Sequence, residues 1–257
     1  MIEKFLQHKR YYVYFEGGLG DILLQYFKYE CLPFLKELKE RQPDTYVKAI
    51  LSTHNSMSGE IFRYHPYIDE VELHTYAPDY ISKLLPLLHY QGYTSLRDIV
   101  PGSAAPAGSH DLYLSDNDMT YVKSVLVDSP YTCVHPFAGK QDFKAERAID
   151  WKTLLAQPEN IVIIGGDSAR EFVGREKIEI REAFTSNQPN VINLVNIANP
   201  RIASYIAMHA KYFIGTLSCY VCVAAYQNVP GTCYIPGWLN DDFTELVKQK
   251  GYTRVNL

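Results

Sequence analysis

Three glycines and an aspartate separate an apolar run from a helical pattern in YYVYFEGGLGDILLQYF, near the start of the chain. Glycines permit a tight turn there, and the following helix, predicted to begin at Asp21, offers unpaired N–H groups to an anion. A dinucleotide fingerprint would need a further glycine at Leu23, and Asp21 adds negative charge where a pyrophosphate would lie. Three readings stay open: a phosphate loop, a turn with Asp21 as helix cap, or an active site in which Asp21 does chemistry. The residues of this turn are Gly17, Gly18, Leu19 and Gly20.

A second glycine signal follows the apolar run NIVII, where Gly165, Gly166 and Asp167 precede a charged helical pattern. Ligands of open parallel sheets bind at the carboxyl ends of the strands. With one such turn in each half of the chain, we expect a ligand held between two lobes. The alternative is an ordinary strand-to-helix turn, in which paired glycines are common.

Cationic side chains gather in CVHPFAGKQDFKAERAIDW, which carries Lys144 and Arg147 on a polar loop after a predicted strand. Such cations could neutralise a diphosphate leaving group, on which charge builds as the bond to it breaks. The alternative is a solvated charged loop. His135 ends the strand directly before Pro136, and it is either a cleft residue or only a structural turn residue.

Hydroxyl and thiol side chains lie together in YFIGTLSCYVCVAAY. Thr216 and Ser218 stand where a strand gives way to a helix, so their hydroxyls and the helix N-terminus could receive a phosphate, or could only cap the helix. Cys219 and Cys222 have a spacing that zinc and redox sites use, but no matching second pair of ligands is near in the sequence. We expect these two cysteines to be small buried residues.

The composition narrows the class of protein. The chain has 257 residues, of which 47% are hydrophobic and 21% charged, as in a soluble globular protein. Its net charge of −4 argues against a nucleic-acid partner or acceptor. It has no apolar run near the length of a membrane span and no signal-peptide core in residues 1–10, so we expect a cytoplasmic location without a transmembrane segment. Five scattered cysteines fit reduced thiols in that compartment.

Apolar β-rich runs alternate with helical patterns along the whole chain, which predicts an α/β fold with parallel sheets. The predicted strands are residues 11–15, 46–52, 70–74, 132–135, 161–164, 191–194, 212–214 and 232–235. They form two groups, separated by a Pro/Gly/Ala/Ser loop and a predicted helix at 116–127. We therefore predict an N-terminal lobe (1–128), a C-terminal lobe (129–240), and a terminal amphipathic helix and tail (241–257) near the lobe junction.

Several of these stretches resemble the heptosyltransferases of glycosyltransferase family 9. GGLGDILL resembles the family's N-terminal Gly-x-Gly-Asp turn, and IVIIGGDSARE resembles its strand and Gly-Gly turn. VHPFAG, with the later Lys144, Arg147 and Trp151, resembles the family's hPga…KrWp stretch. The resemblance implies the GT-B fold, in which two Rossmann-like lobes with parallel sheets face a central cleft.

A fourth stretch, ASYIAMHAKYFIGTLSCYVCVAA, looks like the family segment that carries Asp-Ser-Gly and a later histidine. This chain has Thr216, Leu217 and Ser218 at the three positions, and Val221 at the place of the histidine. The departure bears on the sugar and acceptor contacts rather than on the fold, and a donor other than ADP-heptose is compatible with it.

By this resemblance the chain is an inverting, metal-independent glycosyltransferase, with Asp21 as the general base that deprotonates the acceptor hydroxyl. The donor is a nucleotide-diphosphate sugar, of heptose or another sugar, and no other cofactor is expected. The acceptor would be a glycan, a lipid-linked or another hydroxyl-bearing molecule. The residues expected to bind the donor are Lys144, Arg147, Gly165, Gly166, Asp167, Thr216, Leu217 and Ser218. Two alternatives stay open: a nucleotide-sugar epimerase or hydrolase of the same fold, and an inactive binding protein that keeps the scaffold.

Overall fold

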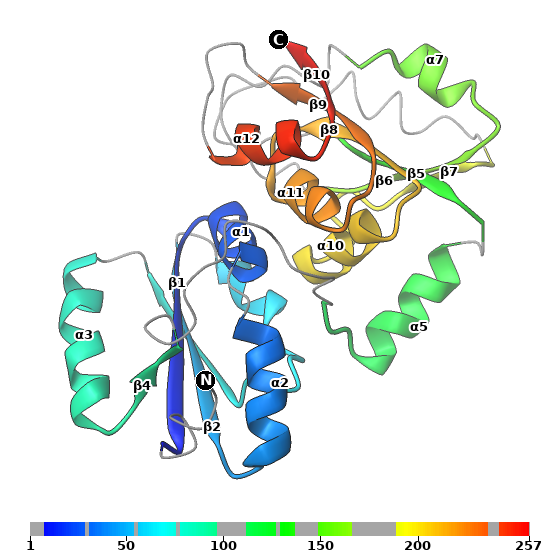
Figure 1. Ribbon diagram of the computed structural model, residues 1–257. Helices are drawn as coiled ribbons and strands as arrows, with labels where there is room; N and C mark the ends of the chain where they lie inside the picture. The colour runs from blue at the N-terminus through cyan, green and yellow to red at the C-terminus, as the bar shows by residue number, and fades with distance from the viewer. Residues whose placement is uncertain are drawn as a thin grey trace. The chain divides into compact units, whose positions relative to one another are not determined.

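The computed structural model divides into two compact units, Met1–Tyr113 and Leu114–Leu257. Each unit carries its own parallel sheet and its own helices (Figure 1). The structure describes residues 8–28, 31–53, 56–75, 78–96, 112–126, 129–136, 149–165, 189–235 and 242–256.

The first unit is built on a parallel sheet with the strand order β3-β2-β1-β4. The strands are β1 (Arg10–Gly17), β2 (Tyr46–Thr53), β3 (Glu70–Thr75) and β4 (Thr94–Ser95). β1 is buried along most of its length because its apolar side chains face helices on both sides. The last residues of β1, β2 and β3 are aligned, so these strands end at one edge of the sheet.

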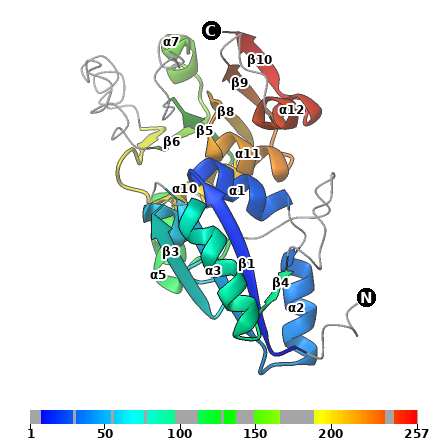
Figure 2. The same ribbon diagram turned by 90° about the vertical axis from the view of Figure 1, so that its left-hand side faces the viewer.

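Helices cover both faces of this sheet, with α3 on one face and α1 and α2 on the other (Figures 1 and 2). Their bounds are α1 (Leu19–Lys28), α2 (Cys31–Arg41) and α3 (Pro78–Tyr90), and the 3₁₀ helix η2 spans Ser56–Ile61. Under α3, Tyr12 and Ile50 pack with Ile81 and Leu88 in a buried cluster. The apolar stripe of α3 thus fixes this helix on the sheet.

The second unit is built on a larger parallel sheet with the strand order β10-β9-β8-β5-β6-β7. Its strands are β5 (Tyr131–His135), β6 (Asn160–Ile163), β7 (Val191–Asn193), β8 (Tyr212–Thr216), β9 (Gly231–Ile235) and β10 (Thr253–Asn256). The central strand β5 is buried throughout, as expected for a parallel strand covered on both faces.

Five helices of the described segments belong to the second unit: α5 (Asp116–Val125), α7 (Trp151–Leu155), α10 (Pro200–Met208), α11 (Cys219–Tyr226) and α12 (Asp242–Gln249). On the α7 face, Val134, Ile161 and Ile163 pack with Leu154. α10, α11 and α12 follow one another in contact, and α11 is almost wholly buried. Such a helix, apolar on all sides, is typical of the centre of a domain.

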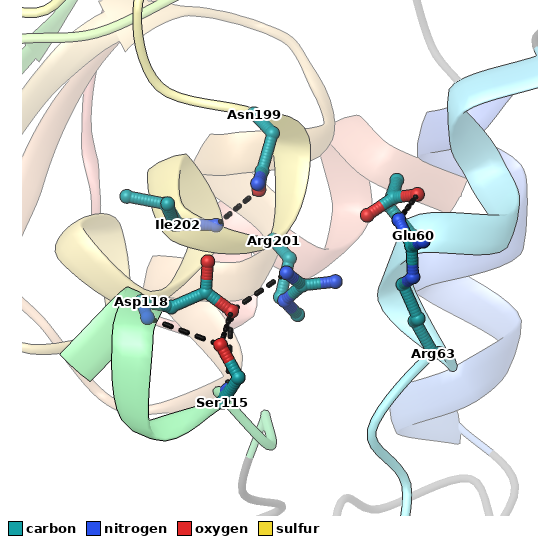
Figure 3. A network of polar contacts seen from close by, with 7 residues as sticks. All are labelled: Glu60, Arg63, Ser115, Asp118, Asn199, Arg201 and Ile202. Atoms are coloured by element: carbon teal, nitrogen blue, oxygen red, sulfur yellow. Dashed lines mark hydrogen bonds and ion pairs between the residues drawn. The ribbon is translucent and has the colours of Figure 1, made fainter. Parts of the chain in front are cut away.

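Helix α5 is held to the second unit by a buried ion pair. The Asp118 carboxylate accepts a hydrogen bond from the Arg201 guanidinium of α10 at 2.7 Å, and Arg201 is only 2% exposed (Figure 3). The same carboxylate accepts hydrogen bonds from the amide and the hydroxyl of Ser115, which closes a capping box at the start of α5. The second unit therefore begins at Leu114 and includes α5, whereas the sequence placed the boundary near Ser129 and α5 in the first lobe.

The predicted α/β class with two parallel sheets is confirmed, and all eight predicted strands are present. β4 and β10 were not predicted, since β4 is two residues long and β10 is largely polar. The C-terminal helix is present as α12, and its placement near a junction of lobes stays a prediction. None of the helices in the described ranges is long and apolar enough to cross a membrane.

Candidate functional site

The first candidate site is the turn between β1 and α1. α1 begins at Leu19, so Asp21 is the third residue of the helix, and its Oδ2 accepts a hydrogen bond from the Gly18 amide at 2.8 Å. Asp21 thereby pairs one of the backbone donors left unpaired at a helix start, as the acidic residue of a capping box does. Its negative charge also lies at the favourable end of the helix dipole.

Gly17 is required in this turn for two separate reasons. Its φ of +110° lies in a region that side-chain-bearing residues rarely adopt. A Cβ on Gly17 would also lie 2.6 Å from the Cβ of Asp21 and 2.7 Å from its Oδ2, which is too close. The Asp21 carboxylate can therefore hold its place only while position 17 has no side chain.

Two of the predicted turn residues lie in the helix instead. The Gly18 carbonyl accepts a hydrogen bond from the Ile22 amide at 3.1 Å, so helical bonding starts earlier than predicted. Leu19 and Gly20 form the first turn of α1, and their prediction as loop residues was wrong. Asp21 is exposed, so it is both a cap and a carboxylate that solvent or a substrate can reach.

The strand that leads into this turn is fixed by Gln25 of α1. The Gln25 side chain donates to the Glu16 carbonyl at 2.7 Å and accepts from the Glu16 amide at 3.3 Å. The Tyr14 hydroxyl donates to the Glu16 carboxylate at 2.7 Å. A second carboxylate, which was not predicted from the sequence, is therefore held in a defined orientation next to the turn.

The second candidate site lies at the carboxyl edge of the larger sheet, where β5 and β8 run side by side (Figure 1). His135 ends β5, and its Nδ1 lies 2.9 Å from the hydroxyl of Ser218, in a hydrogen bond. The His135 ring also meets the Tyr220 ring edge-on, with centroids 4.8 Å apart. These three residues come from two segments far apart in the sequence, and the parallel pairing of β5 with β8 brings them together.

Burial lowers the pKa of His135 to about 3, so the imidazole is neutral at physiological pH. Ser218 is the N-cap residue of α11, yet its side chain makes no capping hydrogen bond. Its hydroxyl is bonded to His135 instead. Ser218 thus does not cap the first amides of α11, so the positive end of this helix can attract an anion.

Gly215 makes the approach of these two strands possible. It pairs with His135 in the sheet register, and a Cβ at position 215 would lie 2.6 Å from the His135 carbonyl oxygen. Next to it, Thr216 is fully buried, and its hydroxyl has no hydrogen-bond partner in the described part of the chain. Leu217 is buried, and its amide donates to the Tyr234 carbonyl at 3.2 Å.

Gly165 lies directly after β6, beside β5 in the same sheet, with a φ of +121°. Its carbonyl accepts a hydrogen bond from the Asn196 amide at 2.9 Å, and its role in donor binding stays a prediction. The other predicted donor residues, Lys144, Arg147, Gly166 and Asp167, lie outside the described residues.

Four cysteines whose side chains the structure describes are free thiols. Cys133, Cys222 and Cys233 are buried, and Cys219 is half-buried. Burial raises the pKa of Cys219 to about 12, although backbone N–H groups at the start of α11 act in the opposite direction. In the segments that the structure describes, there is no group of three or more His, Cys, Asp or Glu side chains that could hold a metal ion.

Sequence reasoning missed Gly215 and Tyr220 as parts of the second site. The signal for Gly215 was present, because a glycine that ends an apolar run marks a close approach of another backbone. Nothing in the local sequence indicated that Tyr220 packs on His135, since that contact depends on the pairing of distant strands.

The fold is similar to that of several solved glycosyltransferases. E. coli ADP-heptose LPS heptosyltransferase II matches with a TM-score of 0.60 and 15% identity, over 96% of this chain and 90% of that one. A glycosyl transferase family 9 protein from Veillonella parvula matches with a TM-score of 0.58 and 14% identity, over 97% and 85%. E. coli heptosyltransferase WaaC with ADP-2-deoxy-2-fluoro heptose matches with a TM-score of 0.53 and 9% identity, over 96% and 92%.

No protein-family model matches the chain, and no curated protein matches its sequence. The likeness is therefore one of structure, and it extends over nearly the whole chain. The chain has the fold of the heptosyltransferases of glycosyltransferase family 9.

Proposed function

We propose that the chain is an inverting, metal-independent glycosyltransferase that transfers a sugar from a nucleotide-diphosphate sugar to an acceptor hydroxyl. The observation that carries this proposal is the open N-terminus of α11, whose N-cap Ser218 bonds to His135 instead of capping the helix. It lies at the carboxyl edge of a parallel sheet, where α/β folds bind nucleotides. The fold similarity to enzymes solved with ADP and with an ADP-heptose analogue supports the same reading.

On the donor side, the first amides of α11 and the Ser218 hydroxyl are the groups proposed to bind the diphosphate. Negative charge builds on the diphosphate as the bond to the anomeric carbon breaks, and donors fixed in advance stabilise that charge. Neutral His135 adds no charge of its own and holds Ser218 in place. Lys144 and Arg147 remain proposed cationic partners of the same group.

On the acceptor side, Asp21 is the proposed general base. As the acceptor oxygen forms its bond to the anomeric carbon, the hydroxyl proton passes to the Asp21 carboxylate and the electron pair of the broken bond leaves with the diphosphate. Attack from the face opposite the leaving group inverts the configuration. A positioned base contributes about 10²–10⁴-fold to such a step. The Gly18 amide fixes the carboxylate, and its exposure leaves it accessible.

The first experiment is a thermal-shift panel of ADP-, GDP-, UDP- and CDP-sugars with the full chain. We expect one nucleotide class to raise the melting temperature, and Ser218→Ala to reduce that shift. Product analysis of the preferred donor, with and without glycan acceptors, then identifies the reaction. Free sugar released at full rate without any acceptor would identify a hydrolase, and absence of any shift across the panel would favour an inactive binding protein.

A further inference from the structure

A row of polar side chains crosses the sheet of the first unit near the ends of its strands. The register aligns Glu16 of β1 with Ser52 of β2, and Ser52 with His74 of β3. Aligned residues of parallel strands point to the same face, and side chains two apart in a strand share that face. Tyr12 and Ile50 follow the same alternation and pack under α3, so the row lies on the α3 face. Glu16, Ser52 and His74 are called the edge row below.

The middle member of the edge row is a buried hydroxyl without a partner. Ser52 is 1% exposed, and its Oγ makes no hydrogen bond within the described part of the chain. A buried polar group left unpaired destabilises the folded chain, and folded proteins keep few such groups. A ligand hydroxyl that reached Ser52 would remove this cost.

The third member, His74, is oriented by a carboxylate. Its Nε2 lies 2.7 Å from Oε1 of Glu72, and the other oxygen of Glu72 accepts from the Lys48 ammonium at 2.9 Å. Glu72 and Lys48 therefore neutralise each other, while Glu72 holds the imidazole ring. The opposite ring nitrogen, Nδ1, has no partner among the described residues and can bond to a ligand hydroxyl.

An exposed aromatic ring stands beside the row. Tyr80, in the first turn of α3, is 50% exposed, and its ring centroid lies 5.1 Å from that of His74. At the other end of the row, the Glu16 carboxylate is held by the Tyr14 hydroxyl. An aromatic face next to several fixed hydrogen-bonding groups suits a sugar ring, because such a ring has apolar C–H faces and hydroxyls around its rim.

We propose that the edge row and Tyr80 form a binding site for a neutral, hydroxyl-rich glycan. Within the described residues the row contains no lysine or arginine, and nearby Lys48 is already paired with Glu70 and Glu72. A phosphorylated ligand would meet the Glu16 carboxylate without a compensating cation. The inference rests on the proposed function only in taking this glycan as the sugar acceptor; the binding site itself stands on the first unit alone.

The test is saturation-transfer NMR on the full chain with the methyl glycosides of glucose, galactose and mannose, and with glucose 6-phosphate as the charged probe. We expect at least one methyl glycoside to bind and the phosphate to bind more weakly. Tyr80→Ala should weaken binding about tenfold, equivalent to about 1.4 kcal/mol. Ser52→Ala should weaken it severalfold without lowering the melting temperature, because the variant removes an unpaired hydroxyl.

Tyr90→Ala is the matched control, since Tyr90 lies on the same helix and is 91% exposed; its binding should equal that of the unaltered chain. The proposal is overturned if no methyl glycoside binds, if Tyr80→Ala and Ser52→Ala bind as the unaltered chain does, or if the phosphate binds best. Nucleotide sugars are absent from these samples. A failed nucleotide-sugar thermal shift would thus contradict the proposed function and leave the glycan result standing.

Discussion

The Cβ of Asp21 lies only 2.6 Å from the point where a Cβ on Gly17 would stand. This relationship links the shape of the β1–α1 turn to the position of its carboxylate. The glycine is needed both for its backbone conformation and for the space that it leaves to Asp21. Any substitution of Gly17 should therefore displace the Asp21 carboxylate, the proposed general base.

Gly17→Ala tests this link. We expect it to lower the free energy of unfolding by about 2–3 kcal/mol or more, since a residue forced into a sparsely populated backbone region costs about 1–3 kcal/mol before any clash is added. Gly92→Ala is the control, because Gly92 also has a positive φ, of +82°, but nothing lies within 4 Å of its Cβ position. Urea unfolding measures the free energy of unfolding of both variants. Equal losses of this free energy would mean that the clash with Asp21 adds no cost of its own.

Ser218→Ala tests the second site. We expect it to lower the free energy of unfolding by about 1 kcal/mol, the value of one hydrogen bond, and to weaken nucleotide-sugar binding. Ser204→Ala is the matched control, since Ser204 is fully buried in α10 and its hydroxyl has no partner in the described segments. Calorimetric titration should find donor affinity unchanged in the control. A Ser218→Ala chain that binds donor as tightly as before would exclude a donor role for this residue.

Arg201→Ala tests the attachment of α5 to the second unit. Although burial acts to raise it, hydrogen bonds from Ser115 and Arg201 lower the pKa of Asp118 below its ordinary value, so Asp118 is charged. Removing Arg201 leaves the Asp118 carboxylate bonded to Ser115 but without its charged partner, and the loss of one partner of a buried ion pair costs about 3–5 kcal/mol. Arg63→Ala is the control, because its pair with Glu60 involves an Arg63 side chain that is 60% exposed (Figure 3) and should contribute less than about 1 kcal/mol. Denaturant unfolding measures both; a loss below about 1 kcal/mol for Arg201→Ala would contradict the assignment.

The burial of His65 should make the free energy of unfolding fall in acid. Burial lowers its pKa to about 3, from an ordinary value of 6.5, so the folded chain keeps the ring neutral. As the pH falls below about 6.5, the unfolded chain binds a proton that the folded chain does not, and stability is lost until the pH nears 3. At pH 5 this amounts to about 2 kcal/mol relative to pH 7. In His65→Gln, the fall in unfolding free energy between pH 7 and pH 5 should be smaller by that amount; an unchanged fall would show that His65 is not the group responsible.

Helices and strands that have a local sequence pattern could be predicted from the sequence. Apolar runs bounded by turn residues predicted the strands of both sheets, and Ser218 marked the start of α11 correctly. The start of α1 was placed two residues late, because aspartate is favoured both at the N-cap and in the first turn, and a glycine turn does not distinguish the two.

Contacts between distant residues could not be predicted in the same way. The bond between His135 and Ser218 joins residues 83 positions apart and depends on β5 lying next to β8. The edge row depends on the register of three strands, and a shift by one residue would turn Ser52 to the opposite face. Such sites follow from topology and register, which one sequence alone leaves open.

The role of Asp21 as general base is tested by the rate of sugar transfer by Asp21→Asn, measured with the preferred nucleotide sugar and acceptor. Asparagine keeps an oxygen that can accept from the Gly18 amide, so the cap and the fold should survive while the base is lost. We predict a fall in kcat of about 10²–10⁴-fold, with donor affinity and melting temperature nearly unchanged. Transfer at the unaltered rate in a folded Asp21→Asn chain would show that Asp21 is not the general base, and Asp21 would then be a helix cap alone.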